Sequence, residues 1–319
     1  MELHETYQLL PEELNNLHFD LFISVLGYEK RGVYLIEKYN IHADRKICLA
    51  HSEKKGLLNR SDNELIFRQN GFEIINVSGE QIFPVDALLK SICTNRSKVI
   101  RILVDYSSMT KVWYSGIINN LSGLGPVCNK IEVYFSYTPA LFDQFKKQKP
   151  AKLAYSVVSE KRKPLNNKKP LALIIGLGLN NLKAEMLIKS VKPSVVYLFY
   201  ADPAHSIDYV QRLFKNNQSL IESTDIRNLH NFPLKDLEAT SKMLTKLCLD
   251  LRLRYNILIA PVGPKVFTLI TLILANRYPD IDVWRVSAGT NEPAIDRIGD
   301  GDPLIYAVDF VNDLPDNDD

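Results

Sequence analysis

Short apolar runs rich in isoleucine, valine, leucine and phenylalanine recur along this chain, with helix-length segments between them. In the first half these runs predict strands at residues 19–26, 46–51, 72–77, 99–105 and 131–137. Their apolar residues are nearly continuous rather than alternating, as is typical of parallel strands covered on both faces. Segments that predict helices are residues 31–39, 63–69, 85–93 and 112–121. The alternation predicts an α/β fold with a doubly wound parallel sheet.

The second half of the chain repeats this plan. Its predicted strands are residues 171–176, 195–200, 257–261 and 283–286, and its predicted helices are residues 181–190, 207–216, 237–251 and 266–277. The turns correspond at an offset of about 150 residues: FISVLGYEKRG matches LIIGLGLNNLK, and ILVDYSSMTK matches LIAPVGPK. We therefore predict two Rossmann-like lobes related by internal duplication, residues 1–145 and 171–319.

Residues 146–170 are predicted to link the two lobes. They are rich in lysine and asparagine and contain prolines at positions 150, 164 and 170. A basic arm that binds nucleic acid is the alternative interpretation, but aromatic residues do not interleave with the lysines apart from Tyr155. A solvated linker is the favoured interpretation.

Composition restricts the partners and the compartment. Thirty-nine basic side chains against thirty-seven acidic ones leave a net charge of +2, so direct nucleic-acid binding is not indicated. The four cysteines (Cys48, Cys93, Cys128 and Cys248) form no short-spaced pair, which favours buried thiols in a reducing compartment. The N-terminus lacks the pattern of a signal peptide, and the apolar stretches are too short to span a bilayer. We expect a cytoplasmic protein that does not bind membranes.

The candidate ligand-binding residues lie in the loops that follow the predicted strands. Ligands of open α/β sheets bind outside the carboxyl ends of the strands, where helix N-termini favour anions. After the first strand of the first lobe these residues are Gly27, Tyr28, Glu29 and Arg31. After the fourth strand they are Asp105, Ser107, Ser108, Thr110 and Lys111. A lysine and hydroxyls at a helix start suit a phosphate or nucleotide, whereas helix capping would explain one hydroxyl.

The second lobe offers a matching set of candidates. They are Gly176, Gly178, Asn180, Asp202, Gly263, Lys265, Arg285 and Ser287. Lys111 and Lys265 occupy equivalent places, each near the start of the helix that follows the fourth strand. The spacing therefore predicts that the two lysines serve related roles in the two copies.

Several well-known site types are not supported. Gly176 and Gly178 resemble the first two glycines of a dinucleotide fingerprint, but Asn181 stands where a third glycine or alanine is needed. The six histidines form no metal-binding pattern, and neither a GxSxG elbow nor a Walker A loop is present. We predict no metal and no cofactor, and assign no catalytic residue. Glu29, Asp105, Asp202 and His205 are the candidates for acid–base chemistry near the loops.

The turn from Asp105 to Lys111, together with the glycine turn after the first strand, resembles the CRISPR-associated Rossmann fold (CARF) family. In that family, a loop after strand one and a hydroxyl-rich turn ending in Thr-Lys after strand four contact the ligand. The resemblance implies a cyclic oligonucleotide ligand, and a tandem copy would resemble the CARF dimer in one chain, as in SAVED-type sensors. Two departures are the absence of a visible effector domain and the missing hydroxyls around Gly263 and Lys265.

Three functions follow as hypotheses. The first is a sensor that binds a nucleotide or other phosphorylated small molecule and acts through a separate effector protein, in an anti-phage or stress pathway. The second is an enzyme acting on a nucleotide or phosphosugar at the same loops, such as a ring nuclease that cleaves a cyclic oligonucleotide. The third is a non-catalytic interaction subunit that keeps the fold without the pocket.

Overall fold

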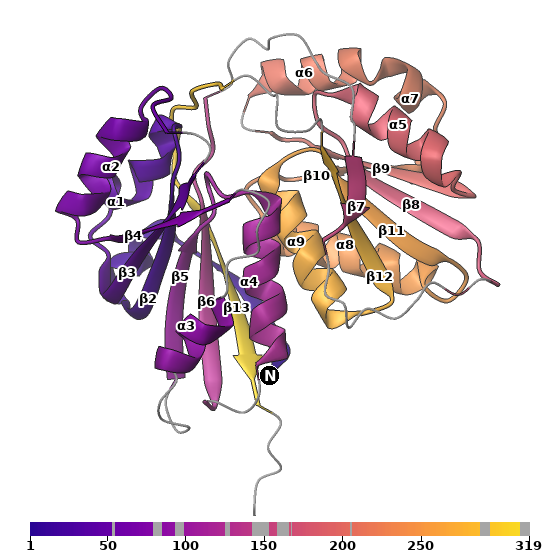
Figure 1. Ribbon diagram of the computed structural model, residues 1–319. Coiled ribbons are helices and arrows are strands. Elements are labelled where there is room, and N and C mark those ends of the chain that lie inside the picture. The colour runs from indigo at the N-terminus through magenta and orange to yellow at the C-terminus, as the bar shows by residue number, and fades with distance from the viewer. Residues whose placement is uncertain are drawn as a thin grey trace, which may run out of the picture. The chain divides into compact units, whose positions relative to one another are not determined.

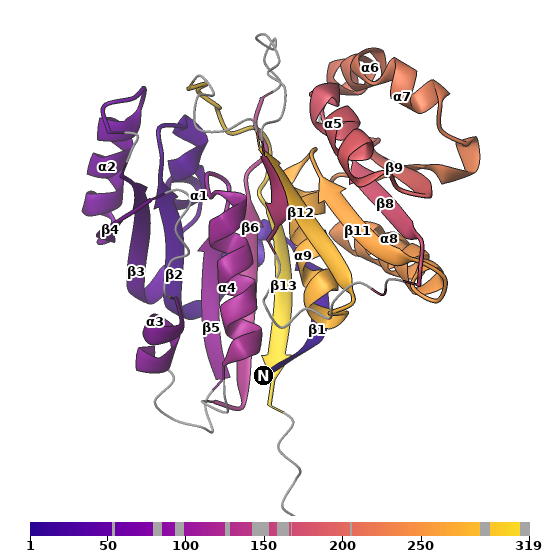
Figure 2. The same cartoon turned by 45° about the vertical axis from the view of Figure 1, so that its right-hand side comes forward.

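Two α/β units make up the chain in the computed structural model (Figures 1 and 2). The first unit contains Met1–Leu141 and Ala294–Asp319, and the second contains Phe142–Pro293. The structure describes residues 1–52, 55–78, 85–92, 99–124, 128–141, 153–157, 166, 168–204, 206–287 and 294–312. His205, Cys93 and most of the predicted linker lie outside these residues.

The first unit has a seven-stranded sheet in the order β1-β13-β6-β5-β2-β3-β4. Its strands are β1 (Glu2–Leu9), β2 (His18–Leu26), β3 (His42–His51), β4 (Glu73–Val77), β5 (Val99–Asp105), β6 (Lys130–Tyr137) and β13 (Leu304–Val311). The strands β2 to β6 are parallel, whereas β13 pairs antiparallel with both β6 and β1. This arrangement confirms the doubly wound parallel sheet that the sequence predicts.

Helices cover both faces of this sheet. They are α1 (Tyr34–Lys38), α2 (Arg60–Gln69), α3 (Val85–Ile92) and α4 (Lys111–Gly123), with short 3-10 turns at Pro11–Asn16 and Lys30–Val33. Leu35 of α1 and Phe67 of α2 share one buried cluster with Phe22 and Cys48 of the sheet. The helices α3 and α4 pack against each other on the opposite face, as right-handed crossovers require (Figure 2).

The second unit has a six-stranded sheet in the order β10-β9-β8-β11-β12-β7. Its strands are β7 (Leu153–Ser156), β8 (Leu171–Gly176), β9 (Val195–Ala201), β10 (Leu229–Phe232), β11 (Asn256–Pro261) and β12 (Ile281–Ser287). Its helices are α5 (Asn181–Val191), α6 (Ile207–Asn216), α7 (Gln218–Glu222), α8 (Leu237–Leu251) and α9 (Lys265–Arg277), with a 3-10 turn at Ile226–Asn228. Leu187 and Leu213 pack with Leu173 and Leu198 on one face, and α8 packs against α9.

The two sheets share one parallel topology. In the first sheet, β2 lies between β3 and β5, and β6 lies on the other side of β5. In the second sheet, β8 lies between β9 and β11 in the same way, and β12 lies on the other side of β11. The last parallel strand of each sheet, β6 or β12, pairs with an antiparallel strand, β13 or β7. The two α/β lobes with a repeated plan are therefore confirmed.

The antiparallel strands are exchanged between the two halves of the sequence. β7 follows β6 along the chain but pairs with β12, and β13 follows β12 but pairs with β6.

The predicted boundaries differ from these units in two places: residues 294–319 belong to the first unit, and the predicted linker contains β7. The reason lies in the strand edges, because β13 is almost wholly buried and covers an edge of β6 that would otherwise be unpaired.

Candidate functional site

The loops after β2 and β5 meet where the strand order of the first sheet reverses. β2 pairs with β3 on one side and with β5 on the other, so the chain winds away from this point in both directions. Ligands of doubly wound sheets bind in the crevice outside the carboxyl ends of the strands at such a position. Both groups of first-lobe candidates, Gly27–Arg31 and Asp105–Lys111, lie on these two loops.

Asp105 and Ser107 fix the loop after β5 from inside. The Asp105 carboxylate accepts hydrogen bonds from the Ser107 backbone N–H at 3.0 Å and from its Oγ at 2.5 Å. Ser107 Oγ in turn accepts a hydrogen bond from Thr138 N at 2.8 Å. Asp105 and Ser107 are both buried, so their side chains join the ends of β5 and β6.

Thr110 caps the helix that follows. It has extended backbone angles, and its Oγ1 accepts a hydrogen bond from Trp113 N at 3.3 Å. Helix capping therefore accounts for the Thr110 hydroxyl. Lys111 is the first residue of α4, at the helix end where the dipole favours an anion. The loop and the cap therefore place a lysine next to the strand-order reversal.

Ser108 joins the loop after β5 to the loop after β2. Its Oγ lies 3.5 Å from a Glu29 carboxylate oxygen. A Cβ at Gly27 would meet Ser108 Cβ at 3.6 Å, and a Cβ at Gly32 would meet its Oγ at 3.2 Å. All three hydroxyls of this turn therefore have contacts within the protein, more than the sequence suggested.

The carboxylate of Glu29 binds two arginines. Arg31 Nε donates to Glu29 Oε2 at 2.7 Å, and the Arg297 guanidinium donates to Glu29 Oε1 at 2.5 Å. Arg31 is buried and also contacts Thr138 O at 3.3 Å and the Tyr137 ring. Burial alone would lower the pKa of Arg31, but Glu29 and Tyr137 raise the pKa by more, so it lies above its ordinary value. The Arg297 side chain is 43% exposed and leaves positive charge at the surface of this cluster.

A segment near the C-terminus crosses the loop after β2. Arg31 N donates to Arg297 O at 2.9 Å, and Lys30 N donates to Asp296 Oδ1 at 2.8 Å. A Cβ at Gly299 would lie 2.5 Å from the Tyr34 ring, so this segment approaches the start of α1 closely. Asp296 and Arg297 were not predicted as site residues, because residues 171–319 were assigned to the other lobe. No local motif marks them.

Helix α2 holds the backbone of the glycine turn. Asn63 Nδ2 donates to Gly27 O at 3.1 Å and to Glu29 O at 3.0 Å, and Asn59 Nδ2 donates to Tyr28 O at 3.3 Å. These bonds engage the carbonyl groups of the turn, while Tyr28 is half-buried. The turn is thus held in place from within the first unit.

The corresponding loops of the second unit pack backbone on backbone. A Cβ at Gly263 would stand 2.0 Å from Leu177 O, and a Cβ at Gly178 would stand 2.6 Å from Val262 O. A Cβ at Gly176 would overlap the Phe267 ring at 2.4 Å. Close packing therefore explains these three glycines without a ligand.

The remaining second-lobe candidates are spread over several elements. Asn180 precedes α5, and Lys265 is the first residue of α9, which matches the position of Lys111 in α4. Asp202 follows β9, one strand away. Arg285 and Ser287 lie in β12, where Arg285 donates to the Tyr155 hydroxyl at 2.5 Å. Gly176, Gly178, Gly263, Asn180 and Lys265 therefore lie on the loops after β8 and β11, where the strand order of the second sheet reverses. Asp202, Arg285 and Ser287 lie on other strands or loops.

Metal-ligand clusters and membrane-spanning helices are both absent from the part of the chain that the structure describes. Within the described ranges no group of three or more His, Cys, Asp and Glu side chains could hold a metal ion. Cys48, Cys128 and Cys248 are buried free thiols, and burial raises the pKa of Cys248 to about 12. None of the helices in the described part of the chain has the length and apolarity needed to cross a bilayer.

Comparisons with known proteins give no family. No family model and no curated protein matches the chain. Among solved structures, the chain is similar to the cytoplasmic domain of a prokaryotic cation chloride cotransporter. That match has 11% identity and covers 86% of this chain and 98% of the other, with a TM-score of 0.23. A TM-score this low carries no inference about function, so the site itself must supply one.

Proposed function

We propose that the first unit binds a nucleotide or other phosphorylated small molecule at the loops after β2 and β5. The observation that carries this proposal is the meeting of both loops at the strand-order reversal of the first sheet. The start of α4, with Lys111 as its first residue, adds a positive helix end at the same place.

The charges around these loops favour an anion. Lys30, Arg31, Lys111 and Arg297 stand against Glu29, Asp105 and Asp296. Glu29 is shared by two arginines, and Asp105 is used within its own loop. We assign phosphate oxygens to the exposed part of Arg297 and to Lys111, the first residue of α4.

A sensing role follows from the resemblance to CARF domains. In this proposal the ligand is a nucleotide, with cyclic oligonucleotides as the first class to test. The chain then acts on a separate effector protein in an anti-phage pathway. The first unit is preferred over the second because backbone packing at Gly178 and Gly263 fills the equivalent position there.

A thermal-shift panel tests the proposal. The panel contains AMP, ATP, cyclic di-adenylate and cyclic tri-, tetra- and hexa-adenylate, each with the wild type, Lys111→Ala and Lys265→Ala. Both variants remove one positive charge from the first residue of a 13-residue helix, so Lys265→Ala is the matched control. At a ligand concentration about 100 times Kd, binding adds about 2.7 kcal/mol of stability.

The expected result is a shift of several degrees for one class of nucleotide in the wild type and in Lys265→Ala. Lys111→Ala loses the shift but keeps the melting temperature of the ligand-free protein. A panel without any shift contradicts the proposal, as does an equal shift in both variants. Chromatography of the recovered nucleotide separates sensor from enzyme, because a sensor returns it intact.

A further inference from the structure

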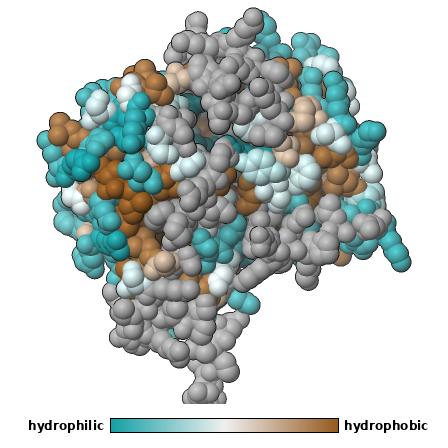
Figure 3. All heavy atoms as spheres, in the orientation of Figure 1, coloured by the Kyte–Doolittle hydropathy of each residue, from teal (hydrophilic) through white to brown (hydrophobic). Residues whose placement is uncertain are grey.

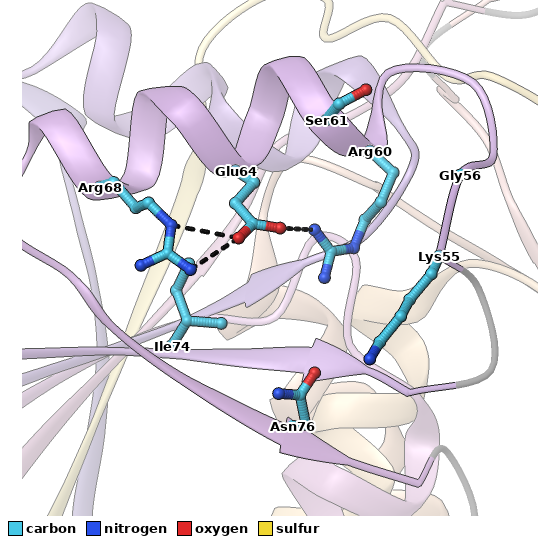
Figure 4. Close-up of a pocket in the computed structure, with 8 residues that line it drawn as sticks. All are labelled: Lys55, Gly56, Arg60, Ser61, Glu64, Arg68, Ile74 and Asn76. Atoms are coloured by element: carbon cyan, nitrogen blue, oxygen red, sulfur yellow. Dashed lines mark hydrogen bonds and ion pairs between the residues drawn. The ribbon is translucent and has the colours of Figure 1, made fainter.

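A polar pocket lies in the first unit, between α2 and β4. It has a volume of about 310 Å³ and lies beside the turn that precedes α2 (Figure 4). The residues that line it are Lys55, Gly56, Arg60, Ser61, Glu64, Arg68, Ile74 and Asn76. Figure 3 shows hydrophilic and hydrophobic side chains interspersed on the viewer's face of the first unit. Leu57 and Leu58, which lie in the turn before α2, are exposed.

The lining of this pocket is cationic. Lys55, Arg60 and Arg68 stand against one carboxylate, Glu64. Arg60 donates to Glu64 Oε2 at 2.7 Å, and Arg68 donates to Oε1 at 2.7 Å, so both carboxylate oxygens are engaged. Hydrogen bonds from Arg68 and then from Arg60 lower the pKa of Glu64, which keeps it ionised at neutral pH. Among the lining residues, three cations therefore stand against one carboxylate.

Arg60, one of the lining residues, has an N–H group that is unsatisfied within the described ranges. The residue is only 5% exposed, and its buried Nε finds no hydrogen-bond acceptor among the described residues. A guanidinium cannot lose its proton in a protein, so an unpaired buried N–H of this group is destabilising. Asn59, which precedes the helix, makes no side-chain capping bond, so the start of α2 has no side-chain acceptor from that residue.

Lys55 and Asn76 complete the pocket from the opposite side. In Figure 4 the two side chains point toward the space below the Arg60 guanidinium, from the turn before α2 and from β4. Lys55 is exposed, so its ammonium can move to meet a ligand. An anion there would receive an ammonium donor, a guanidinium donor and an amide donor.

The geometry points to a phosphate-binding pocket, which takes inorganic phosphate or the terminal group of a phosphomonoester. Phosphate oxygens would accept hydrogen bonds from the Arg60 guanidinium and from the Asn76 amide, and Lys55 would pair with the remaining negative charge. A tetrahedral dianion suits two cations that approach from different directions. None of its lining residues belongs to the loops after β2 and β5, so the pocket does not depend on the nucleotide site proposed above.

Calorimetric titration of the full chain with sodium phosphate tests the pocket. We expect the wild type to bind phosphate, and Lys55→Ala, an exposed loop variant, to bind about tenfold more weakly, which corresponds to about 1.4 kcal/mol. Arg60→Gln, checked for folding by circular dichroism, is expected to lose measurable binding. Lys246→Ala, which removes an exposed lysine of the second unit, is the charge-matched control and should bind as the wild type does.

A second titration with AMP separates the two sources of phosphate. AMP binding that weakens in Lys55→Ala identifies a phosphomonoester, whereas binding of inorganic phosphate alone identifies the free ion. The proposal is overturned if the wild type does not bind phosphate, or if Lys55→Ala binds it as tightly as the wild type. It is also overturned if Lys111→Ala rather than Lys55→Ala weakens phosphate binding, because the phosphate then occupies the other site.

Discussion

The guanidinium of Arg297 donates a 2.5 Å hydrogen bond to the carboxylate of Glu29, although 268 positions separate the two residues. This pair exists because residues 294–312 return to the first unit, where β13 pairs with β6 and β1. The loop after β2 is therefore completed by the last part of the chain. Residues far apart in the sequence thus contribute to one candidate site.

Removal of residues 294–319 should destabilise the first unit. The truncation leaves β6 with an unpaired edge and separates β1 from the sheet, since β1 pairs through β13. We expect aggregation in size-exclusion chromatography and loss of part of the cooperative unfolding transition. A monodisperse truncated chain with the melting temperature of the wild type would contradict the observed strand pairing.

Glu29→Gln should cost much more stability than Arg297→Ala. Arg31 is 3% exposed, and without the Glu29 carboxylate its charge is buried without an anionic partner, at a cost of about 3 kcal/mol. The Arg297 side chain is 43% exposed, so loss of its ion pair should cost about 1 kcal/mol or less. Urea unfolding measures both values. Equal losses in the two variants would show that Glu29 is not needed to neutralise Arg31.

Gly263→Ala should severely destabilise the second unit, whereas Gly27→Ala should have a small effect. The new Cβ at position 263 would lie 2.0 Å from Leu177 O, which is backbone and cannot rotate away. At position 27 the new Cβ would meet Ser108 Cβ at 3.6 Å, an ordinary van der Waals contact. We expect a loss of about 3 kcal/mol for Gly263→Ala in denaturant unfolding. Tolerance of alanine at position 263 would argue against the tight packing of these loops.

Acid should weaken the second unit through His230. Its ring stacks on Phe199 at 4.9 Å, and burial lowers its pKa below the ordinary value of 6.5. Below about pH 6.5 the imidazole of His230 is protonated in the unfolded chain but stays neutral in the folded chain, so the stability of the fold decreases as the pH falls. We expect the melting temperature to fall between about pH 7.5 and pH 5.5, and His230→Phe to reduce that slope. An unchanged slope in His230→Phe would assign the pH dependence to other groups.

The parallel strands and most helices could be predicted because each carries its signal locally. Continuous apolar runs mark β2 to β6, and the helix predicted at residues 237–251 coincides with α8. The missed strands have weaker local signals or lie outside the repeat. β1 is half-exposed with charged residues, β10 has four residues, and β7 lies in a lysine-rich segment. β13 is apolar, but its position after the second copy did not reveal that it pairs with β6.

The candidate site could be predicted in part for the same reason. Loops that follow parallel strands can be located from the strands, so Gly27–Arg31 and Asp105–Lys111 were placed on one edge of the sheet. The partners of these residues depend on tertiary contacts, and nothing near Arg297 indicates that it binds Glu29. The glycines of the second unit were assigned to a ligand because a sequence does not distinguish backbone packing from a phosphate loop.

Hydrogen–deuterium exchange in the presence of the nucleotides of the panel tests the central claim most directly. The account predicts that a binding nucleotide slows exchange in peptides covering residues 27–33 and 105–113, and that Lys111→Ala abolishes this protection. The loops of the second unit at residues 177–180 and 262–265 should exchange at the same rate with and without the nucleotide. Protection confined to peptides outside 27–33 and 105–113, or no change with any nucleotide, would contradict the proposed site.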